Sequence, residues 1–213
     1  MSTQLFEDNR WSTTPQKKEF RHDMAIALTP TGTVLDVGCG DGLLLQMLKE
    51  QGIETKGVDI SDVAVEVCTQ KGFTVLKNDF TTDVLPFGEG SFDTVIALDV
   101  LEHVYNPEKL LSEIHRVSKS DVVISVPNFA SLPARIQVLL GRVPENNRPN
   151  KGHLYWFTWK VLKDVLAKEH FVIEEGRFNT IWEHIPVLGL MTKMLARMYP
   201  SLFALSFVVR CKK

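Results

Sequence analysis

The fold is decided by one short stretch, Asp36-Val37-Gly38-Cys39-Gly40-Asp41-Gly42. It follows the strand-like run Thr33-Val34-Leu35 and leads into an apolar segment at 43–50. A strand, a glycine-rich turn and a helix in this order are typical of sites for nucleotide-like ligands, because the turn lets the backbone approach the ligand and the helix start presents unpaired N–H groups. Asp36 is the unusual member. A pyrophosphate has no use for an anion at the strand end, whereas a cationic amino-acid group does.

The composition is that of an ordinary globular protein, with 213 residues, 44% hydrophobic residues, 23% charged residues and a net charge of -2. We expect a single domain at 1–213 and no nucleic-acid partner, since nucleic-acid binders carry a basic surplus. Residues 1–21 lack the apolar core of a secretory signal. The three cysteines have neither the pattern of a disulfide framework nor zinc-ligand spacing. These features predict a cytoplasmic protein without a metal site.

Strand-like runs alternate with helix-like segments through most of the chain. The predicted strands lie at 34–37, 55–60, 73–76, 92–98, 121–126, 171–174 and 205–210. Helices are predicted after Gly42, Ser61, Asn106 and Thr158, of which the last three are capping residues. This alternation predicts an α/β fold with a Rossmann-like, doubly wound, mostly parallel seven-stranded sheet, which binds ligands at the carboxyl ends of its strands.

Four carboxylates, Asp36, Asp59, Asp79 and Asp99, recur about every 20 residues, the length of one strand-helix unit. Each lies at or just past a predicted strand end, so all four are expected at one edge of the sheet. Asp59 suits a ribose diol, because a carboxylate can accept from both hydroxyls. Asp79 could accept from the exocyclic amine of adenine, and Asp36 could act on an ammonium group directly or through water.

With these motifs the chain resembles the class I S-adenosylmethionine-dependent methyltransferases, over roughly Thr33 to Phe171. The resemblance rests on Asp-Val-Gly-Cys-Gly-Asp-Gly at 36–42, Gly-Val-Asp-Ile at 57–60, Asn-Asp-Phe at 78–80 and Phe-Asp-Thr-Val-Ile-Ala-Leu-Asp-Val-Leu-Glu-His-Val at 92–104. It implies an antiparallel C-terminal strand, for which 205–210 fits. Segments at 126–129, 139–142 and 153–158 further resemble the MetW-like branch of the type 11 methyltransferases.

The resemblance implies S-adenosylmethionine as cofactor, S-adenosylhomocysteine as product, and a set of site residues. Asp59 would hold the ribose, Asp79 and Phe80 would frame the adenine, and Asp99 with the glycine turn would contact the methionine portion. The expected cofactor-binding residues are Asp36, Gly38, Cys39, Gly40, Gly42, Asp59, Ile60, Asn78, Asp79, Phe80, Asp99 and Val100. A nicotinamide cofactor is disfavoured, because its G-x-G-x-x-G fingerprint differs from the spacing of Gly38, Gly40 and Gly42.

Methyl transfer from a sulfonium is an in-line displacement that mainly requires alignment, and it needs a general base only for some acceptors. His103 lies just beyond the fourth strand and is the predicted base or acceptor contact, with capping or packing of the next helix as the alternative. His153 and Tyr155 belong to an aromatic cluster at 153–157 that could form an acceptor wall or anchor its loop to the core.

Three further segments carry expectations about the acceptor. The N-terminal arm 1–30 and the insertion 128–156 are expected to cover the cofactor and shape the acceptor pocket. The helical segment 181–204 has a Met-rich face, formed by Leu188, Met191, Leu195 and Met198. Core packing is expected of this face, with a homodimer face, a lipid-like acceptor site or a peripheral membrane contact as alternatives. Charged residues and a proline interrupt 181–207, so no transmembrane span is expected.

Two functions remain open at this point. The first is methyl transfer from S-adenosylmethionine to a small-molecule acceptor through an oxygen, nitrogen or carbon nucleophile. The second comes from the MetW-like resemblance, because that branch is associated with methionine biosynthesis alongside a homoserine acyltransferase. It is a regulatory or partner protein that binds the cofactor but does not catalyse methyl transfer.

Overall fold

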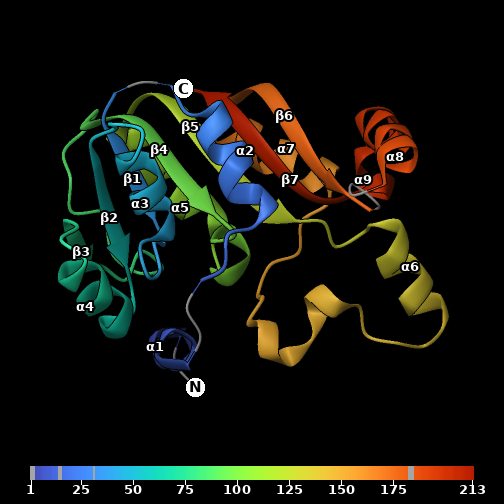
Figure 1. Cartoon of the computed structure of the whole chain (residues 1–213), viewed down its shortest axis with the longest axis horizontal. Coiled ribbons are helices and arrows are strands. Elements are labelled where there is room, and N and C mark those ends of the chain that lie inside the picture. The colour runs from blue at the N-terminus through green and yellow to red at the C-terminus, as the bar shows by residue number, and fades with distance from the viewer. Residues whose placement is uncertain (1–2, 14–15, 31, 182–184) are drawn as a thin grey trace.

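The centre of the structure, a computed structural model that describes residues 3–13, 16–30, 32–181 and 185–213, is one seven-stranded sheet (Figure 1). The strand order is β3-β2-β1-β4-β5-β7-β6. The strands are β1 (Val34–Val37), β2 (Thr55–Asp59), β3 (Val75–Lys77), β4 (Phe92–Leu98), β5 (Ser118–Pro127), β6 (Val172–Thr180) and β7 (Ala204–Lys212). Pairings from β3 through β5 are parallel, and β7 lies antiparallel to both β5 and β6. The predicted fold class, including the antiparallel C-terminal strand, is confirmed.

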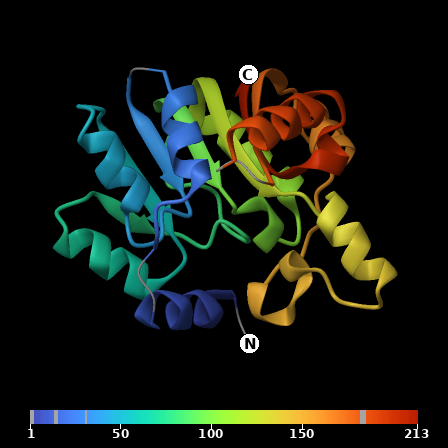
Figure 2. The same cartoon turned by 45° about the vertical axis from the view of Figure 1, so that its right-hand side comes forward.

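Helices cover both faces of this sheet (Figures 1 and 2). The α-helices are α1 (Thr3–Thr13), α2 (Phe20–Leu28), α3 (Leu43–Lys49), α4 (Asp62–Gln70), α5 (Pro107–Val117), α6 (Leu132–Leu139), α7 (Trp159–Lys168), α8 (Pro186–Met198) and α9 (Pro200–Phe203). Short 3₁₀ turns are η1 (Leu101–His103), η2 (Glu145–Asn147) and η3 (Pro149–Lys151). The α5 and α7 side chains join the larger core cluster, whereas α2 and α3 pack on the opposite face.

Local sequence explains where these helices begin. Ser61, Asn106 and Thr158 each accept a hydrogen bond from a backbone N–H in the first turn of the following helix, as the sequence predicts. The central strands β1, β4 and β5 are buried over nearly their whole length. Such strands read as continuous apolar runs because helices cover both of their faces.

The prediction for β6 was too short, because it ended at Glu174 and the strand continues to Thr180. Its residues alternate between exposed and partly buried positions, since β6 forms the edge of the sheet and pairs only with β7 among the described strands. Charged side chains are therefore tolerated along it, and an apolar run is a poor signal for such a strand.

The N-terminal arm forms two helices with different surroundings. Ala25 and Leu28 of α2 are buried against the sheet. In contrast, α1 lies below the carboxyl edge of the sheet, beside the 3₁₀ turns of the insertion (Figure 2). Gly152 marks this contact, because a Cβ atom there would lie 2.8 Å from the Phe6 ring. The arm and the insertion therefore meet over the edge where the predicted site residues gather.

The prediction that the Met-rich face packs in the core is wrong. Leu188, Met191 and Met198 are 39%, 52% and 67% exposed, and α8 packs instead through Thr192 and Ala196. Residues 182–184 of the predicted 181–204 segment lie outside the described residues. Across the described ranges, no helix combines the length and apolar content that a membrane span requires.

Asn128 fastens the end of β5 to the start of β7. Its side-chain amide donates to the carbonyls of Ala204 (2.7 Å) and Ser201 (3.0 Å), and its oxygen accepts from Ala130 N–H (3.0 Å). The side chain is fully buried. Asn128→Ala should therefore lower the free energy of unfolding by about 2–3 kcal/mol in urea titrations, because several buried backbone groups lose their partner. The exposed control Asn150→Ala should stay near the wild type, and an equal effect in both variants would contradict this account.

Candidate active site

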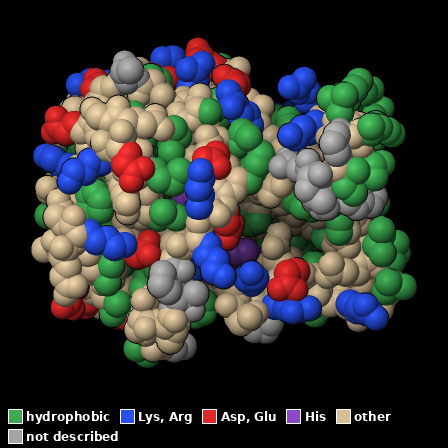
Figure 3. Space-filling model, in the orientation of Figure 1, with side chains coloured by type: hydrophobic (Ala, Val, Ile, Leu, Met, Phe, Trp, Pro, Cys, Tyr) green, Lys and Arg blue, Asp and Glu red, His purple; other side chains and the backbone are tan. Residues whose placement is uncertain are grey.

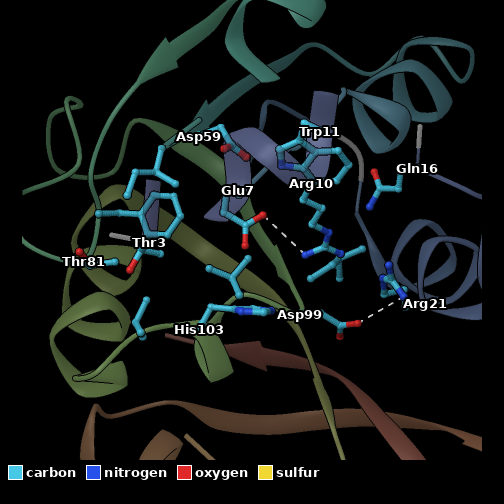
Figure 4. Close-up of a pocket in the computed structure, with 16 residues that line it drawn as sticks. Thr3, Glu7, Arg10, Trp11, Gln16, Arg21, Asp59, Thr81, Asp99 and His103 are labelled. Carbon is cyan, nitrogen blue, oxygen red and sulfur yellow. Dashed lines mark ion pairs between the residues drawn. The ribbon is translucent and has the colours of Figure 1, made fainter. Parts of the chain in front are cut away.

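A cavity lies between the carboxyl ends of the parallel strands and α1 (Figure 4). The sheet edge contributes residues that the sequence singled out: Gly38, Asp59, Ile60, Phe80, Asp99, Val100 and His103. The arm contributes Thr3, Glu7, Arg10, Trp11, Gln16 and Arg21, and the remaining lining is Thr81, Leu98 and Val104. The cavity thus has an apolar interior with acidic groups along the strand ends and cations on the arm.

Two glycines of the turn are required by close contacts. Gly38 (φ 74°) would place a Cβ atom 2.6 Å from Val100, and Gly40 (φ 53°) would place one 2.5 Å from the Trp11 ring. Both positive φ values also disfavour other residues. The turn can therefore lie flat under the cavity, with the Trp11 ring of α1 directly against it.

Asp59 ends β2 with its carboxylate held by backbone donors. Its two oxygens accept from Gly40 N–H (2.8 Å) and Ser61 N–H (2.9 Å). Burial raises the pKa of Asp59, while these N–H groups oppose that shift. A carboxylate has about four lone-pair sites, so Asp59 can still accept from a ligand in the cavity.

Asp99 follows β4 in a left-handed conformation, with φ of 54°. The Ser125 hydroxyl donates to one of its oxygens, and the Arg21 guanidinium lies 3.3 Å from the other (Figure 4). Positive φ is unusual for a residue other than glycine and marks sites where neighbours over-determine the backbone. Here Ser125 and Arg21 hold the carboxylate at the border of the cavity.

Some predicted cofactor residues lie behind the lining. Among the described residues, the lining does not include Asn78, Asp79, Cys39, Gly40, Gly42 or Asp36. The Asp79 carboxylate accepts from the backbone and side chain of Thr81, and Asn78 donates to the Val84 carbonyl. These two residues shape the turn that presents Phe80 and Thr81 to the cavity.

Cys39, Gly42 and Asp36 support the turn from within the protein. A Cβ atom at Gly42 would lie 2.9 Å from the Cys68 sulfur, and Cys39 is buried beside Gly57. A hydrogen bond with Cys68 and burial hold the pKa of the Cys39 thiol well above its usual value, which excludes a thiolate nucleophile at neutral pH. Asp36 is 3% exposed, and burial together with nearby Asp59 raises its pKa to about 8.

A second, more open cavity adjoins the first and shares Arg10, Arg21, Asp99 and His103 with it. Figure 3 shows histidine side chains inside this hollow, between acidic and basic groups. His103 and His153 stack edge to face there, with ring centroids 4.9 Å apart. The structure therefore brings together two histidines that are 50 positions apart in the chain.

The environment of His103 makes it a weak base. Burial first, and then the neighbouring His153 and Arg10, lower the pKa of His103 to about 4. Its Nδ1 lies 3.2 Å from the Gly152 carbonyl, so the neutral ring donates there. An imidazole with this pKa is uncharged at pH 7 and accepts a proton only weakly, which favours an acceptor contact over a general base.

Tyr155 lies apart from both cavities. Its ring packs 4.9 Å from that of Phe157, against the larger core cluster. Of the two interpretations of the aromatic cluster, Tyr155 fits the anchor, whereas His153 lines the second cavity.

The sequence prediction missed Glu7 and Arg10. Both belong to α1, where they lie one helical turn apart, and Arg10 Nη1 is 3.6 Å from the Glu7 carboxylate (Figure 4). The i, i+3 spacing of opposite charges was a signal for a helix in the arm, but it gave no information on the helix position over the cavity.

Comparison with known proteins decides the family. The model of the family described as methionine biosynthesis protein MetW matches residues 20–169, well over half of the chain. The chain belongs to the MetW family. Its predicted resemblance is thereby confirmed.

Curated relatives of this MetW-family protein include two kinds. It is 32% identical over 114 residues to the ubiquinone biosynthesis O-methyltransferase of Methylococcus capsulatus, covering 50% of this chain and 48% of that protein. It is 30% identical over 173 residues to the bifunctional methionine biosynthesis protein MetXA/MetW of Rhodopirellula baltica, covering 72% of this chain and 27% of that protein. The chain thus spans about half or less of the length of these relatives.

Solved structures share the fold of this MetW-family protein. A SAM-dependent methyltransferase from Archaeoglobus fulgidus matches with a TM-score of 0.66 and 24% identity, covering 98% of each chain. The magnesium protoporphyrin IX methyltransferase of Synechocystis PCC 6803, solved with bound SAH, matches with a TM-score of 0.65 and 18% identity, covering 100% of this chain and 95% of that one. The architecture is that of class I methyltransferases.

The raised pKa of Asp36 has a consequence for stability. The folded protein keeps the Asp36 proton up to about pH 8, whereas an unfolded chain releases it near pH 4. The folded state therefore binds more protons in this window, and Asp36 makes the free energy of unfolding fall as pH rises, by at most about 1.4 kcal/mol per pH unit. Asp36→Asn should flatten this decline in urea titrations between pH 5 and pH 8. The exposed α7 control Asp164→Asn should keep the wild-type slope, and an unchanged slope in Asp36→Asn would contradict the assignment.

Proposed function

We propose that this protein binds S-adenosylmethionine in the cavity between the strand ends and α1 and transfers its methyl group to a small-molecule acceptor in the adjoining cavity. One observation carries the proposal. Across the sheet, in the order β3, β2 and β4, the strand ends line a single cavity with an apolar wall and then two acidic groups, namely Phe80, Asp59 and Asp99. This spatial order matches an adenine, a ribose and an amino-acid portion.

The residues fit the donor by their chemistry. Asp59 would accept from the ribose hydroxyls, Ile60 and Phe80 would flank the adenine, and Asp99 would accept from the ammonium group of the methionine portion. The absence of a side chain at Gly38 lets Val100 pack directly against the turn, where a Cβ atom would lie 2.6 Å from it. Asp36 and Asp79 would act indirectly, since Asp36 lies behind the turn and Asp79 orders the loop of Thr81.

When bound, S-adenosylmethionine supplies an activated methyl group on a good leaving sulfur. The chain then has to orient the acceptor and exclude water. His103 borders both cavities and would contact the acceptor. The arm covers the donor side through Trp11 and Arg10 of α1, and the insertion covers the acceptor side through Asn146, Lys151 and His153. We therefore assign residues 1–30 to covering the donor and residues 128–156 to covering the acceptor.

Donor binding can be tested at Asp59. Asp59→Asn should weaken S-adenosylmethionine binding at least tenfold in calorimetry, about 1.4 kcal/mol or more, because an amide cannot accept at both of its polar atoms. Asp62→Asn, three positions along but paired with Lys77 outside the cavity, is the matched control and should bind like the wild type. Thermal melting of both variants separates lost binding from lost folding. Wild-type affinity in Asp59→Asn would overturn the donor site.

Turnover can be tested by S-adenosylhomocysteine release from a panel of hydroxyl, amine and carbon acceptors. An acceptor that is methylated should react about tenfold more slowly with His103→Ala, since the loss of one hydrogen bond is worth ~1.4 kcal/mol. His115→Ala on α5, whose ring packs against Phe171 away from the cavities, should retain the wild-type rate. Equal rates in both variants would remove His103 from the acceptor site.

A second candidate function is a regulatory or partner role in methionine biosynthesis. The observation behind it is the bifunctional MetXA/MetW protein, of which this chain matches only 27% although that match covers 72% of the chain. A protein of this type would bind S-adenosylmethionine and a homoserine acyltransferase without methylating anything. The acyltransferase rate with and without this protein and its donor would distinguish the two functions, because a partner role requires a change in that rate.

A further inference from the structure

Three potential metal ligands converge on the wall of the second cavity. Glu102, His103 and His153 each offer one ligand atom, and these atoms all lie within 4.8 Å of one another. His153 Nε2 is 3.9 Å from the Glu102 carboxylate. Zinc–nitrogen bonds of about 2.0–2.1 Å would hold such atoms at most about 4.2 Å apart, so side-chain movements of about an ångström would bring the three groups into coordination distance.

The missing hydrogen bonds of the buried Glu102 carboxylate indicate a bound cation. The residue is 1% exposed, and neither carboxylate oxygen has a hydrogen-bond partner within the described part of the chain. An isolated buried carboxylate without a partner is costly, and such groups are usually paired or coordinate a metal. His103 and His153, which are metal-ligand types, each offer a ring nitrogen within 4.8 Å of it.

Backbone hydrogen bonds hold the segments that carry the three residues close together. The Glu102 carbonyl accepts from Leu154 N–H (2.7 Å) and Tyr155 N–H (3.0 Å), which fixes the segment next to His153 against η1. The His103 Nδ1 lies 3.2 Å from the Gly152 carbonyl. Metal-binding histidines commonly use one ring nitrogen for such a backbone contact, which orients the other towards the ion.

We propose that Glu102, His103 and His153 form a binding site for a divalent transition-metal ion of the zinc type. Two imidazoles with one carboxylate favour zinc and neighbouring transition metals over magnesium or calcium, which prefer all-oxygen sites. Three protein ligands leave further coordination positions open. All three residues line the second cavity, from which an acceptor would reach these positions.

The open positions assign a class of acceptor. This step rests on the proposed function: the ion would bind an oxygen atom of the acceptor, such as a hydroxyl or carboxylate, at the border of the donor cavity, and His103 would then act on the acceptor through the ion. A bound divalent ion lowers the pKa of a hydroxyl ligand.

The test is metal titration of the full-length protein, without a histidine tag and freed of metal by a chelator. Zn²⁺ affinity is measured by competition with a chromophoric chelator, and Co²⁺ coordination by its visible absorption. We expect one ion per chain in the wild type, and at least tenfold weaker binding in both Glu102→Gln and His153→Ala. His115→Ala on α5 is the matched control and should leave metal affinity unchanged. The three cysteines, Cys39, Cys68 and Cys211, are buried, so their thiols should not compete for the added metal.

Two results would overturn the site. One is a wild-type protein that binds no ion, and the other is Glu102→Gln and His153→Ala variants that both bind as tightly as the wild type while melting like it. S-adenosylmethionine calorimetry on the same metal-free samples distinguishes this failure from failure of the proposed function. Donor binding without metal binding would remove the metal site alone, and metal binding without donor binding would remove the donor site alone.

Discussion

The site depends on a solvation constraint: three carboxyl groups, Asp36, Asp59 and Glu102, are almost fully buried at one edge of the sheet. Burial favours the neutral form and raises the pKa of all three. Such groups destabilise the folded chain unless something compensates them. The Asp59 carboxylate accepts from two backbone N–H donors, whereas the Glu102 carboxylate has no hydrogen-bond partner within the described residues. A fold that retains these acids is therefore organised around cationic or hydrogen-bond-donating ligands rather than around maximal stability.

The arm compensates this edge from the outside. Arg10 of α1 and Arg21 at the start of α2 border both cavities, so the cations nearest the acidic edge come from the beginning of the chain. The Trp11 ring packs where a side chain at Gly40 would otherwise lie. Glycine is therefore required at position 40 for two reasons: its φ is positive, and the Trp11 ring leaves no space for a side chain. This links the geometry of the turn to the position of α1.

Much of the fold could be predicted because its signals are local. The strand at 92–98 and the helix caps at Ser61, Asn106 and Thr158 depend on residues within one turn or one strand. Asp59 and Asp99 were predictable for a related reason: parallel strands bring their carboxyl ends to one edge whatever the details of packing. The donor side of the site follows from this topology.

The rest of the site could not be predicted, because it depends on contacts between distant segments. Nothing in the sequence near His153 indicates that backbone bonds to Glu102 place it beside His103. The exposed Met-rich face of α8 has the same helical spacing as a buried face, since periodicity shows that a face is apolar but not what covers it. The absence of zinc-ligand spacing among the cysteines likewise says nothing about histidines and carboxylates that only folding brings together.

The two halves of the site also differ in their relation to the family. The MetW family match spans residues 20–169, which includes η1 and His153 and leaves out α1. Of the four residues that border both cavities, Arg21, Asp99 and His103 lie within the matched region, whereas Arg10 lies outside it, on the α1 cover of the first cavity. Cover that rests on an edge through few side chains can change without disturbing the sheet, because loops and terminal segments tolerate variation that the core does not. His103 lies where these parts meet, and its contacts with Gly152 and His153 connect the first cavity to the insertion, for which we propose the acceptor side.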